Sequence, residues 1–416
     1  MSRQGKTNIV TPASLRTNIK DSIDKFKLPK KDTSVYSFEG ATKANLSGDT
    51  LIVDEAHRLG DSTSGRSKSL VEAAKRHKRV ILLTGSPIRN NPSEIAPLAN
   101  MVGIDKAYAP LSRKNFDNKY IGKKKEKRSF MDFVKGVKPG TITYIKNKDA
   151  LKKNFSNSID KYMPSKDYYP DVIEKTHSIP MSDSQHKLYK NLVDNTNSDV
   201  VYKIGNNRPM TPTERANANT FLSAARILSN SEKPFGGVNI TPKVKAIADS
   251  VTDKPSKNVV YSSFLDGGLN SLSEELKHRN HPHQIYNGSL NDKEKKAIID
   301  KYNKSKTSTL LISGAGAEGL DLKGTRNMHI MEPHWNSARI NQVIGRGARF
   351  KSHTHLPKEE QNVTVRHYLS AIPNKSVGVL GKLLHKKPKV GADEYMTGLS
   401  KRKEELNQEF LNAITG

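Results

Sequence analysis

Two groups of charged residues have the types and spacing that chemistry on a phosphate chain requires. Asp54 and Glu55 follow the apolar run 51–53, which predicts a buried strand. Parallel sheets bind ligands at the carboxyl ends of their strands, so both carboxylates would lie where magnesium and phosphate can be held. Arg346 and Arg349 stand three residues apart and would share a helix face if residues 340–349 are helical. Alternatively, Asp54 and Glu55 simply begin a solvated helix, whose first turn favours acidic residues.

A glycine-rich loop precedes the two arginines. Residues 310–312 are apolar and predict a buried strand, and residues 313–319 follow it with three glycines. Glycine allows the backbone to approach a ligand closely. The plainer alternative is a strand, a loop and a basic solvated helix that hold no ligand.

Strand-like and helix-like segments alternate around these residues. This alternation is typical of an α/β protein with parallel sheets. We expect strands at 8–12, 35–39, 50–53, 79–83, 258–264, 284–288 and 310–312, and helices at 13–26, 268–279 and 292–303. The strand at 79–83 is expected to be buried.

Charge and composition limit the partners. Lys and Arg total 70 against 42 Asp and Glu, so the formal net charge is +28. This excess favours nucleic acid first and an acidic membrane surface second. No apolar run approaches the roughly 20 residues of a membrane span, and we expect a soluble, intracellular protein. The absence of cysteine excludes disulfides and cysteine-ligated metals.

Two further groups of basic or imidazole side chains can be interpreted either as ordinary surface residues or as binding residues. The lysine-rich run 122–128 is either a solvated face or a direct phosphate-binding segment. His353 and His355 lack a carboxylate at a matching spacing, so we expect exposed loop histidines rather than metal ligands.

The stretch 309–350 resembles motifs V and VI of superfamily 2 helicases, residue by residue. The resemblance implies that Arg346 and Arg349 act on the γ-phosphate of ATP and that Gly319, Asp321 and Gln342 help to bind the nucleotide. The matching positions are Gly316, Gly319, Asp321, Leu322, Glu332, Pro333, Trp335, Asn336, Gln342, Gly345, Arg346 and Arg349.

Residues 50–57 and 84–94 resemble motifs II and III of the Swi/Snf-related branch of that superfamily. The resemblance implies that Asp54 holds Mg²⁺ and that Glu55 is the general base for the attacking water. It also implies that His57 senses the γ-phosphate or links it to the other lobe. Thr84 and Ser86 would couple the nucleotide state to DNA contact. The alternative for Thr84 and Ser86 is an ordinary turn capped by a hydroxyl.

Hydroxyl residues in three segments are the predicted DNA contacts. Residues 8–15 resemble motif Ia, which implies that Thr11 and Ser14 contact the DNA backbone. Residues 258–264 resemble motif IV and end in Ser262 and Ser263. Ser313, at the start of the motif V loop, is grouped with them.

The resemblance implies two RecA-like lobes with parallel sheets, joined by a helical connector. The expected domains are a first lobe at 1–105, a basic insert and helical connector at 106–240, a second lobe at 241–372, and a basic tail with a C-terminal helix at 373–416. Within the last range, residues 375–389 are basic and predicted to be flexible.

A phosphate loop of the pattern G-x-x-x-x-G-K-[ST] is missing from the expected place. Gly5, Lys6 and Thr7 imitate its end, but only four residues precede Gly5 and Asn8 already opens a strand. A crossover connection needs a dozen or more residues, so we expect that Lys6 is not the phosphate lysine. A first lobe truncated at its start, a second polypeptide that supplies the loop, and a degenerate lobe remain open explanations.

These observations support two functional hypotheses. The first is an ATP-dependent translocase or helicase-like ATPase that uses Mg²⁺, hydrolyses ATP between its two lobes and acts on double-stranded DNA. The second is a non-hydrolysing DNA-binding or complementing subunit, and RNA is a third, weaker option as the substrate. Residues 351–353, 356–360 and 391–395 resemble a viral and phage subgroup related to poxvirus early-transcription and nucleoside-triphosphatase proteins. A viral origin would imply the host cell cytoplasm or the virion as the location.

Overall fold

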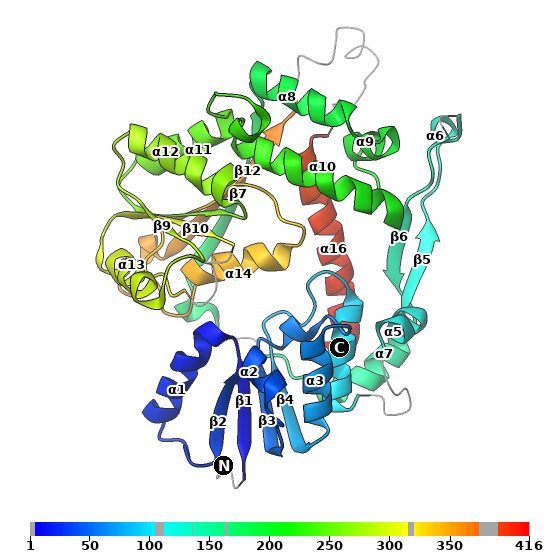
Figure 1. Ribbon diagram of the computed structural model, residues 1–416, viewed down its shortest axis with the longest axis vertical. Helices are drawn as coiled ribbons and strands as arrows, with labels where there is room; N and C mark the ends of the chain where they lie inside the picture. Colours follow the sequence, from blue (N-terminus) through cyan, green and yellow to red (C-terminus); the bar gives the residue numbers. More distant parts are fainter. Residues whose placement is uncertain are drawn as a thin grey trace. The chain divides into compact units, whose positions relative to one another are not determined.

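The computed structural model describes residues 5–104, 112–134, 136–162, 165–314, 320–373 and 390–415 (Figure 1). The chain divides into two compact units. Unit 1 contains residues 1–124, 143–163 and 402–416, and unit 2 contains residues 125–142 and 164–401. The predicted flexible segment 375–389 lies outside the described residues. Within the described ranges, no helix combines the length and the apolar character that crossing a membrane requires.

Unit 1 is built on a four-stranded parallel sheet with the strand order β2-β1-β3-β4. The strands predicted in this part of the sequence are confirmed to within about two residues at most ends. Their bounds are Thr7–Thr11 for β1, Thr33–Ser37 for β2, Gly48–Asp54 for β3 and His77–Leu83 for β4.

The strand β4 is an edge strand, and the prediction that residues 79–83 are buried is wrong. Leu83 is 49% exposed, and Ile81 is only half-buried. A short apolar run does not reveal whether both of its sides are covered. The register places Val35, Ile9, Ile52 and Ile81 in one row across the four strands, and all four are half-buried. Since parallel sheets are normally covered on both faces, this row marks a face that the described residues cover incompletely.

The opposite face of this sheet carries the core of unit 1. Val10, Leu51 and Val53 are fully buried there, and Val80 and Leu82 pack against them. The helices of unit 1 are α1 (Arg16–Lys25), α2 (Phe38–Lys43), α3 (Gly65–Ala74), α4 (Ile95–Val102), α5 (Arg113–Tyr120) and α7 (Lys148–Phe155), with short 3₁₀ turns η1 (Ala13–Leu15), η2 (Ala56–Leu59), η3 (Pro92–Glu94) and η5 (Ser156–Ser158).

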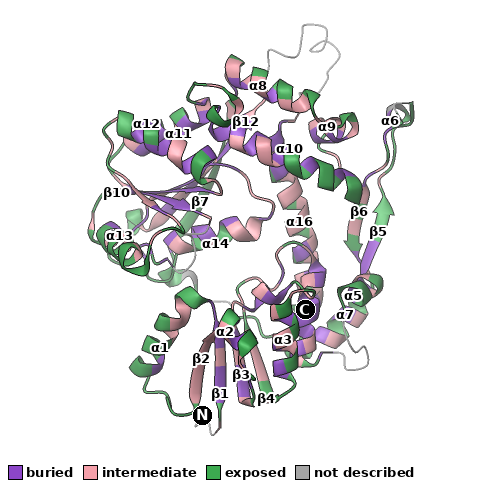
Figure 2. Ribbon diagram, in the orientation of Figure 1, coloured by how far each residue is buried: buried purple, intermediate pink, exposed green. Residues whose placement is uncertain are grey.

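Unit 2 is built on a six-stranded parallel sheet with the order β7-β12-β11-β8-β10-β9. The central strand β8 is buried at every position, as Figure 2 illustrates for the sheet interior. The bounds are Asp171–Pro180 for β7, Lys257–Ser262 for β8, Gln284–Tyr286 for β9, Ser308–Ser313 for β10, Asn327–Ile330 for β11 and Asn362–Ala371 for β12.

The strand β7 joins this sheet although it lies in the range predicted as insert and connector. It pairs with β12 over ten residues, from Asp171 opposite Asn362 to Pro180 opposite Ala371. Most of its side chains are exposed, and it forms one edge of the sheet. Its sequence therefore lacks the apolar run that identified the central strands.

The remaining described helices belong to unit 2, except that the last of them passes into unit 1 at residue 402. They are α6 (Phe130–Val134), α8 (Asp183–Asp194), α9 (Ser198–Gly205), α10 (Pro212–Asn230), α11 (Pro242–Thr252), α12 (Asn270–His278), α13 (Asp292–Lys304), α14 (Ser337–Gly347) and α16 (Ala392–Thr415), with short helical turns η6 (Lys166–Tyr168), η7 (Lys233–Phe235), η8 (Leu265–Leu269) and η9 (Lys358–Glu360). The two strands β5 (Ile121–Lys125) and β6 (Thr141–Ile145) form a separate ladder.

Buried polar contacts tie the start of α16 to the rest of unit 2. Lys243 is fully buried at the start of α11, and its Nζ lies 3.1 Å from Asp393 Oδ2 and 2.6 Å from Ser229 Oγ. Asp393 Oδ2 also accepts a hydrogen bond from the backbone of Ser370 at 2.9 Å. A buried cation is tolerated only with such partners, so these contacts fix where α16 begins.

Candidate nucleotide and nucleic-acid sites

The predicted magnesium ligand lies at the carboxyl end of β3 in unit 1. Asp54 is half-buried, and each of its oxygens accepts one hydrogen bond. Thr11, at the end of the neighbouring strand β1, donates from Oγ1 to Asp54 Oδ2 at 3.0 Å. The backbone NH of Glu55 donates to Oδ1 at 3.0 Å. These bonds orient the carboxylate and leave further lone pairs on both oxygens for a cation.

The predicted general base has a strained backbone. Glu55 adopts φ 50° and ψ 44°, in the left-handed region, between β3 and the 3₁₀ turn η2. A non-glycine residue in such a region costs on the order of 1–3 kcal/mol and persists where the surroundings enforce it. Such strain concentrates at functional sites, and here it separates the directions of two consecutive carboxylates.

His57 connects three polar groups of unit 1. The imidazole is buried, with Nδ1 lying 3.0 Å from Thr84 Oγ1 and 3.2 Å from Glu55 Oε2. Arg89 donates from Nη2 to Nε2. A guanidinium has no acceptor, so Nε2 must be unprotonated and Nδ1 must carry the hydrogen. The ring is therefore a neutral bridge from Arg89 to the Glu55 and Thr84 side.

Burial and neighbouring cations keep this imidazole uncharged. Desolvation, followed by the positive charges of Arg89 and Arg58, lowers the pKa of His57 from 6.5 to about 3. A proton on the ring would also abolish the acceptor that Arg89 uses. At neutral pH, His57 is thus a fixed donor and acceptor and not a titrating group.

The two predicted coupling residues follow β4. Thr84 Oγ1 contacts the His57 ring and also accepts the backbone NH of Ser86 at 3.2 Å. Thr84 therefore lies in the same hydrogen-bonded group as Glu55 and His57, whereas Ser86 meets it through the backbone. Asp54 and its neighbours are thus linked to the turn that begins at Thr84.

Of the two predicted DNA contacts in unit 1, only Ser14 is exposed. The Thr11 side chain is fully buried, with its hydroxyl committed to Asp54. Ser14 lies in the turn η1, directly after β1. A DNA phosphate would therefore meet the Ser14 hydroxyl but only the backbone of Thr11, and both contacts stay predictions.

In unit 2, a buried carboxylate organises the end of β8. Glu332 is 1% exposed and accepts from the hydroxyl of Ser262 at 3.0 Å, the backbone NH of Ser263 at 2.6 Å and the amide of Asn230 at 2.8 Å. Donors on three sides stabilise a buried negative charge. The predicted DNA contact Ser262 thus points its hydroxyl inward, while Ser263 is half-buried.

Arg226 completes this group from helix α10. Its Nη2 lies 3.4 Å from Ser263 Oγ, and its guanidinium lies over the rings of Phe264 at 4.9 Å and Trp335 at 6.0 Å. The connector helix is therefore joined to the turn after β8 and to the segment after β11. Neither Arg226 nor Glu332 was predicted as a site residue, although Glu332 lies in the stretch that resembles motifs V and VI.

The two predicted arginines do not share a helix. Helix α14 ends at Gly347, so Arg346 is in its last turn and Arg349 lies beyond it, which corrects the expectation for residues 340–349. Gly347 is close-packed, since a Cβ there would meet Met328 Sδ at 2.9 Å. After the helix ends, Arg349 Nη1 donates to the carbonyl of Leu320 at 3.1 Å and lies 3.9 Å from Asp321 Oδ1.

The remaining predicted nucleotide residues lie around α14. Gln342 and Arg346 are half-buried on this helix, and Asp321 is exposed beside Arg349. Ser313 is buried at the end of β10, and Gly319 lies outside the described residues. Arg339, which sequence analysis did not single out, donates to the carbonyl of Gly314 and thereby ties α14 to the start of the glycine-rich loop.

The prediction that His353 and His355 are exposed is confirmed for His355 and wrong for His353. His355 is exposed, as expected. His353 is buried, with Nε2 2.8 Å from the carbonyl oxygen of Thr325 and Nδ1 2.8 Å from Ser352 Oγ. Its surroundings are therefore structural. Among the described residues there is no cluster of three or more His, Asp or Glu side chains that could hold a metal on their own.

Comparison with known proteins gives matches along most of the chain. The model of the SNF2-related domain matches residues 9–233, and that of the helicase conserved C-terminal domain matches residues 242–351. The protein named "Putative ATP-dependent RNA helicase L538" of Acanthamoeba polyphaga mimivirus is 31% identical over an alignment 419 residues long that covers 98% of this chain and 86% of that protein.

A second viral relative is the "Termination factor NPH-I homolog" of African swine fever virus (isolate Tick/South Africa/Pretoriuskop Pr4/1996). It is 25% identical, and the match covers 80% of this chain and 57% of the relative. Among solved structures, the SWI2/SNF2 ATPase core of Sulfolobus solfataricus in complex with dsDNA is 18% identical to this chain. The match covers 98% of this chain and 86% of that chain, with a TM-score of 0.39.

The predicted resemblance to viral members is confirmed by the two viral relatives. The chain belongs to the SNF2-related family of helicase-like ATPases and carries a helicase C-terminal domain.

Proposed function

We propose that this protein is a nucleic-acid-stimulated ATPase of the DNA translocase type. The observation that carries the proposal is the hydrogen-bonded group of Thr11, Asp54, Glu55, His57 and Thr84 at the carboxyl edge of the first sheet. An oriented carboxylate beside a second, strained one is what a metal-assisted attack of water on a phosphate requires. The matched family makes ATP the natural substrate.

Magnesium fits the donor set at Asp54. Mg²⁺ is usually held by one or two carboxylates together with substrate phosphates and water, so the absence of a larger acidic cluster among the described residues is no obstacle. When bound, the ion would neutralise charge on the phosphates. Asp54 would hold it, while Glu55 would accept the proton of the attacking water.

The second unit would supply the cations. In our proposal Arg346 and Arg349 act on the same nucleotide as Asp54 and Glu55, with Gln342, Asp321 and Gly319 contributing to its binding. Arg349 would exchange its present contacts with Leu320 and Asp321 for a phosphate oxygen. Breaking these two contacts costs little free energy, because the Arg349 side chain is 43% exposed and water screens its interactions.

Double-stranded DNA is the polymer we propose. Ser14 and Ser263, with the backbones of Thr11 and Ser313, would contact phosphates, and little base reading is expected from hydroxyl and backbone groups. The formal charge of +28 supports a polyanionic partner. The name of the mimivirus relative refers to RNA, so RNA belongs in every assay as a competitor.

The phosphate-loop pattern G-x-x-x-x-G-K-[ST] is not complete at residues 5–7. We propose that a strand carrying it, from an adjoining segment or from a second polypeptide, pairs with the open edge of β4. The exposed Leu83 and the half-buried Ile81 lie at that edge, and a loop at its carboxyl end would reach the level of Asp54, which stands opposite Leu83 in the register.

The test is ATP hydrolysis by the purified chain, alone and with the phosphate loop supplied by the adjoining segment or second polypeptide, in the presence of duplex DNA, of RNA and of neither. We expect stimulation by duplex DNA and, in Glu55→Gln, a loss of about 10²- to 10⁴-fold in turnover, the range for a general base. Glu39→Gln, an exposed carboxylate on α2, is the matched control and should keep full activity. If the wild-type chain binds duplex DNA but hydrolyses nothing even when the phosphate loop is supplied, the second candidate, a non-hydrolysing DNA-binding subunit, replaces the first.

A further inference from the structure

Basic and aromatic side chains gather on one segment of unit 2 outside the predicted motifs. We call residues 125–142 the arm, which comprises the end of β5, helix α6 and the start of β6. Figure 1 shows α6 at the end of the β5–β6 ladder. The backbone NH of Glu126 donates to the carbonyl of Gly140 at 2.9 Å, so the two sides of the arm are paired where it begins.

Large apolar side chains stand uncovered at the tip of the arm. Phe130 is 80% exposed, Phe133 is 69% exposed and Val134 is 62% exposed, all on the five-residue helix α6. Adjacent exposed aromatics of this size usually mark a binding surface. Figure 2 shows exposed residues on α6 and on the neighbouring part of β5.

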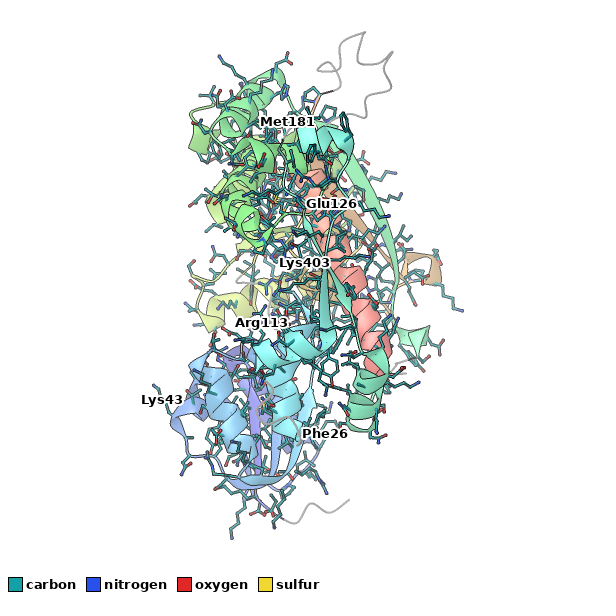
Figure 3. All side chains as sticks on the ribbon, turned by 90° about the vertical axis from the view of Figure 1, so that its right-hand side faces the viewer. Phe26, Lys43, Arg113, Glu126, Met181 and Lys403 are labelled. Atoms are coloured by element: carbon teal, nitrogen blue, oxygen red, sulfur yellow. The ribbon has the colours of Figure 1, made fainter. Side chains whose placement is uncertain are left out.

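The acidic residues of the arm are turned away from this surface. Glu126 and Asp132 are its only two carboxylates, and both pair with Arg208, which donates from Nε to Glu126 at 3.0 Å and from Nη1 to Asp132. Asp132 is fully buried and also accepts from the hydroxyl of Tyr202 at 2.9 Å. Figure 3 labels Glu126 on this arm.

These contacts keep the inner side of the arm ionised and rigid. Burial alone would raise the pKa of Asp132, but hydrogen bonds from Ser129, Arg208 and Tyr202 lower it below its ordinary value. Gly140 packs so closely that a Cβ there would lie 2.1 Å from the carbonyl oxygen of Pro209. The base of the arm is therefore fastened to the segment between α9 and α10.

The outer side is left with cations and aromatic rings. Lys125, Lys127, Arg128 and Lys138 are exposed, and the Arg128 guanidinium lies 5.5 Å from the Phe133 ring centroid. No described carboxylate of the arm points outward to neutralise them. Cations that follow a backbone, next to aromatic faces on which bases can stack, form the arrangement of single-strand nucleic acid sites.

We propose that the arm binds unpaired nucleotides, with Phe130 and Phe133 stacking on bases while Lys125, Lys127 and Arg128 neutralise phosphates. The bases of an intact duplex are already stacked on one another, so the aromatic pair selects single-stranded segments. The inference builds on the proposed function only in taking nucleic acid as the partner. It adds a site outside the predicted motifs.

The experiment measures equilibrium binding of a fluorescent oligothymidine and of a duplex, without ATP, to the full chain. Phe130→Ala and Phe133→Ala should each weaken oligothymidine binding about tenfold, since one base–aromatic stack contributes about 1–3 kcal/mol and 1.4 kcal/mol is tenfold. Duplex binding should change less than about threefold. Phe26→Ala is the matched control, because Phe26 is 66% exposed beside Lys25 in unit 1 (Figure 3), and it should change neither.

A second measurement separates stacking from charge. Lys125→Ala with Lys127→Ala should reduce the slope of log affinity against log salt for the single strand by about 1.4, since each phosphate contact contributes about 0.7. Oligothymidine binding by the double variant Phe130→Ala/Phe133→Ala at the wild-type level would overturn the arm proposal, even if duplex-stimulated hydrolysis is intact. Failure of the wild-type chain to bind any nucleic acid would overturn the proposed function as well.

Discussion

The neutral state of His57 makes the stability of unit 1 depend on pH in a defined way. Its pKa is about 3 in the folded chain and 6.5 in a solvated state. Between these values the unfolded chain binds a proton that the folded chain refuses, so the free energy of unfolding falls as the pH falls below about 6.5. Each pKa unit corresponds to about 1.4 kcal/mol, which gives a loss of about 2 kcal/mol on going from pH 7.5 to pH 5.

The perturbation that isolates this effect is His57→Asn. Other buried histidines, such as His329, also have lowered pKa values, so the informative quantity is the difference between variant and wild type. The variant should be less stable than the wild type at pH 7.5, because contacts with Thr84 and Arg89 change. The disadvantage should shrink by about 2 kcal/mol at pH 5, where only the wild type carries the proton-linked cost.

The assay is urea unfolding followed at several pH values between 5 and 7.5. Arg89→Met supplies a second comparison, since removing the nearest cation should raise the pKa of His57 and flatten the pH dependence. A difference between His57→Asn and wild type that stays constant across this range would refute the neutral, buried bridge.

Three other predictions follow from contacts within single units. Lys203→Met removes the fully buried ammonium that lies 2.6 Å from Glu214 Oε2. The substitution should lower the free energy of unfolding by about 3–5 kcal/mol, because it leaves a carboxylate without its partner. A loss under about 1 kcal/mol in urea unfolding would contradict this prediction. Thr11→Val removes the hydroxyl that orients Asp54, and should raise the Mg²⁺ concentration for half-maximal ATP hydrolysis several-fold; an unchanged Mg²⁺ dependence would mean that Thr11 does not serve the metal. Gly140→Ala places a Cβ 2.1 Å from a backbone oxygen of Pro209 and should lower the free energy of unfolding by about 1–3 kcal/mol. The control is Gly65→Ala, where a Cβ would meet nothing within 4 Å and the substitution should have little effect. Equal thermal midpoints for the two variants would argue against the close packing of the arm.

The chemistry-bearing motifs and the strands β1 to β4 and β8 to β10 could be predicted from the sequence because their patterns are local. The apolar run before Asp54 and the run at 310–312 coincide with β3 and β10. In the second sheet β7, β11 and β12 were not predicted, although β11 and β12 lie inside the sheet, and β7 has mostly exposed side chains. Their place in a sheet depends on neighbours that are distant in the sequence.

The polar partners of the site residues could not be predicted for the same reason. Arg226 acts on the turn after β8 from a helix 37 residues upstream, and Arg208 holds an arm more than 70 residues away in sequence. The end of α14 before Arg349 was also missed. Its sequence continues with residues compatible with a helix, and the close packing of Gly347 against Met328 is visible only in three dimensions.

In the proposed function, acidic groups of the first lobe and arginines of the second act on one nucleotide. The most direct test is the turnover number for ATP at saturating duplex DNA in Arg346→Ala, with Arg113→Ala, an exposed arginine of unit 1 (Figure 3), as the control. An arginine that stabilises the transferring phosphate is worth about 10³- to 10⁵-fold in turnover, so we predict a loss of that size in Arg346→Ala, with unchanged DNA affinity and a near-normal control. Turnover within a few-fold of wild type in Arg346→Ala, while Glu55→Gln is inactive, would contradict the account.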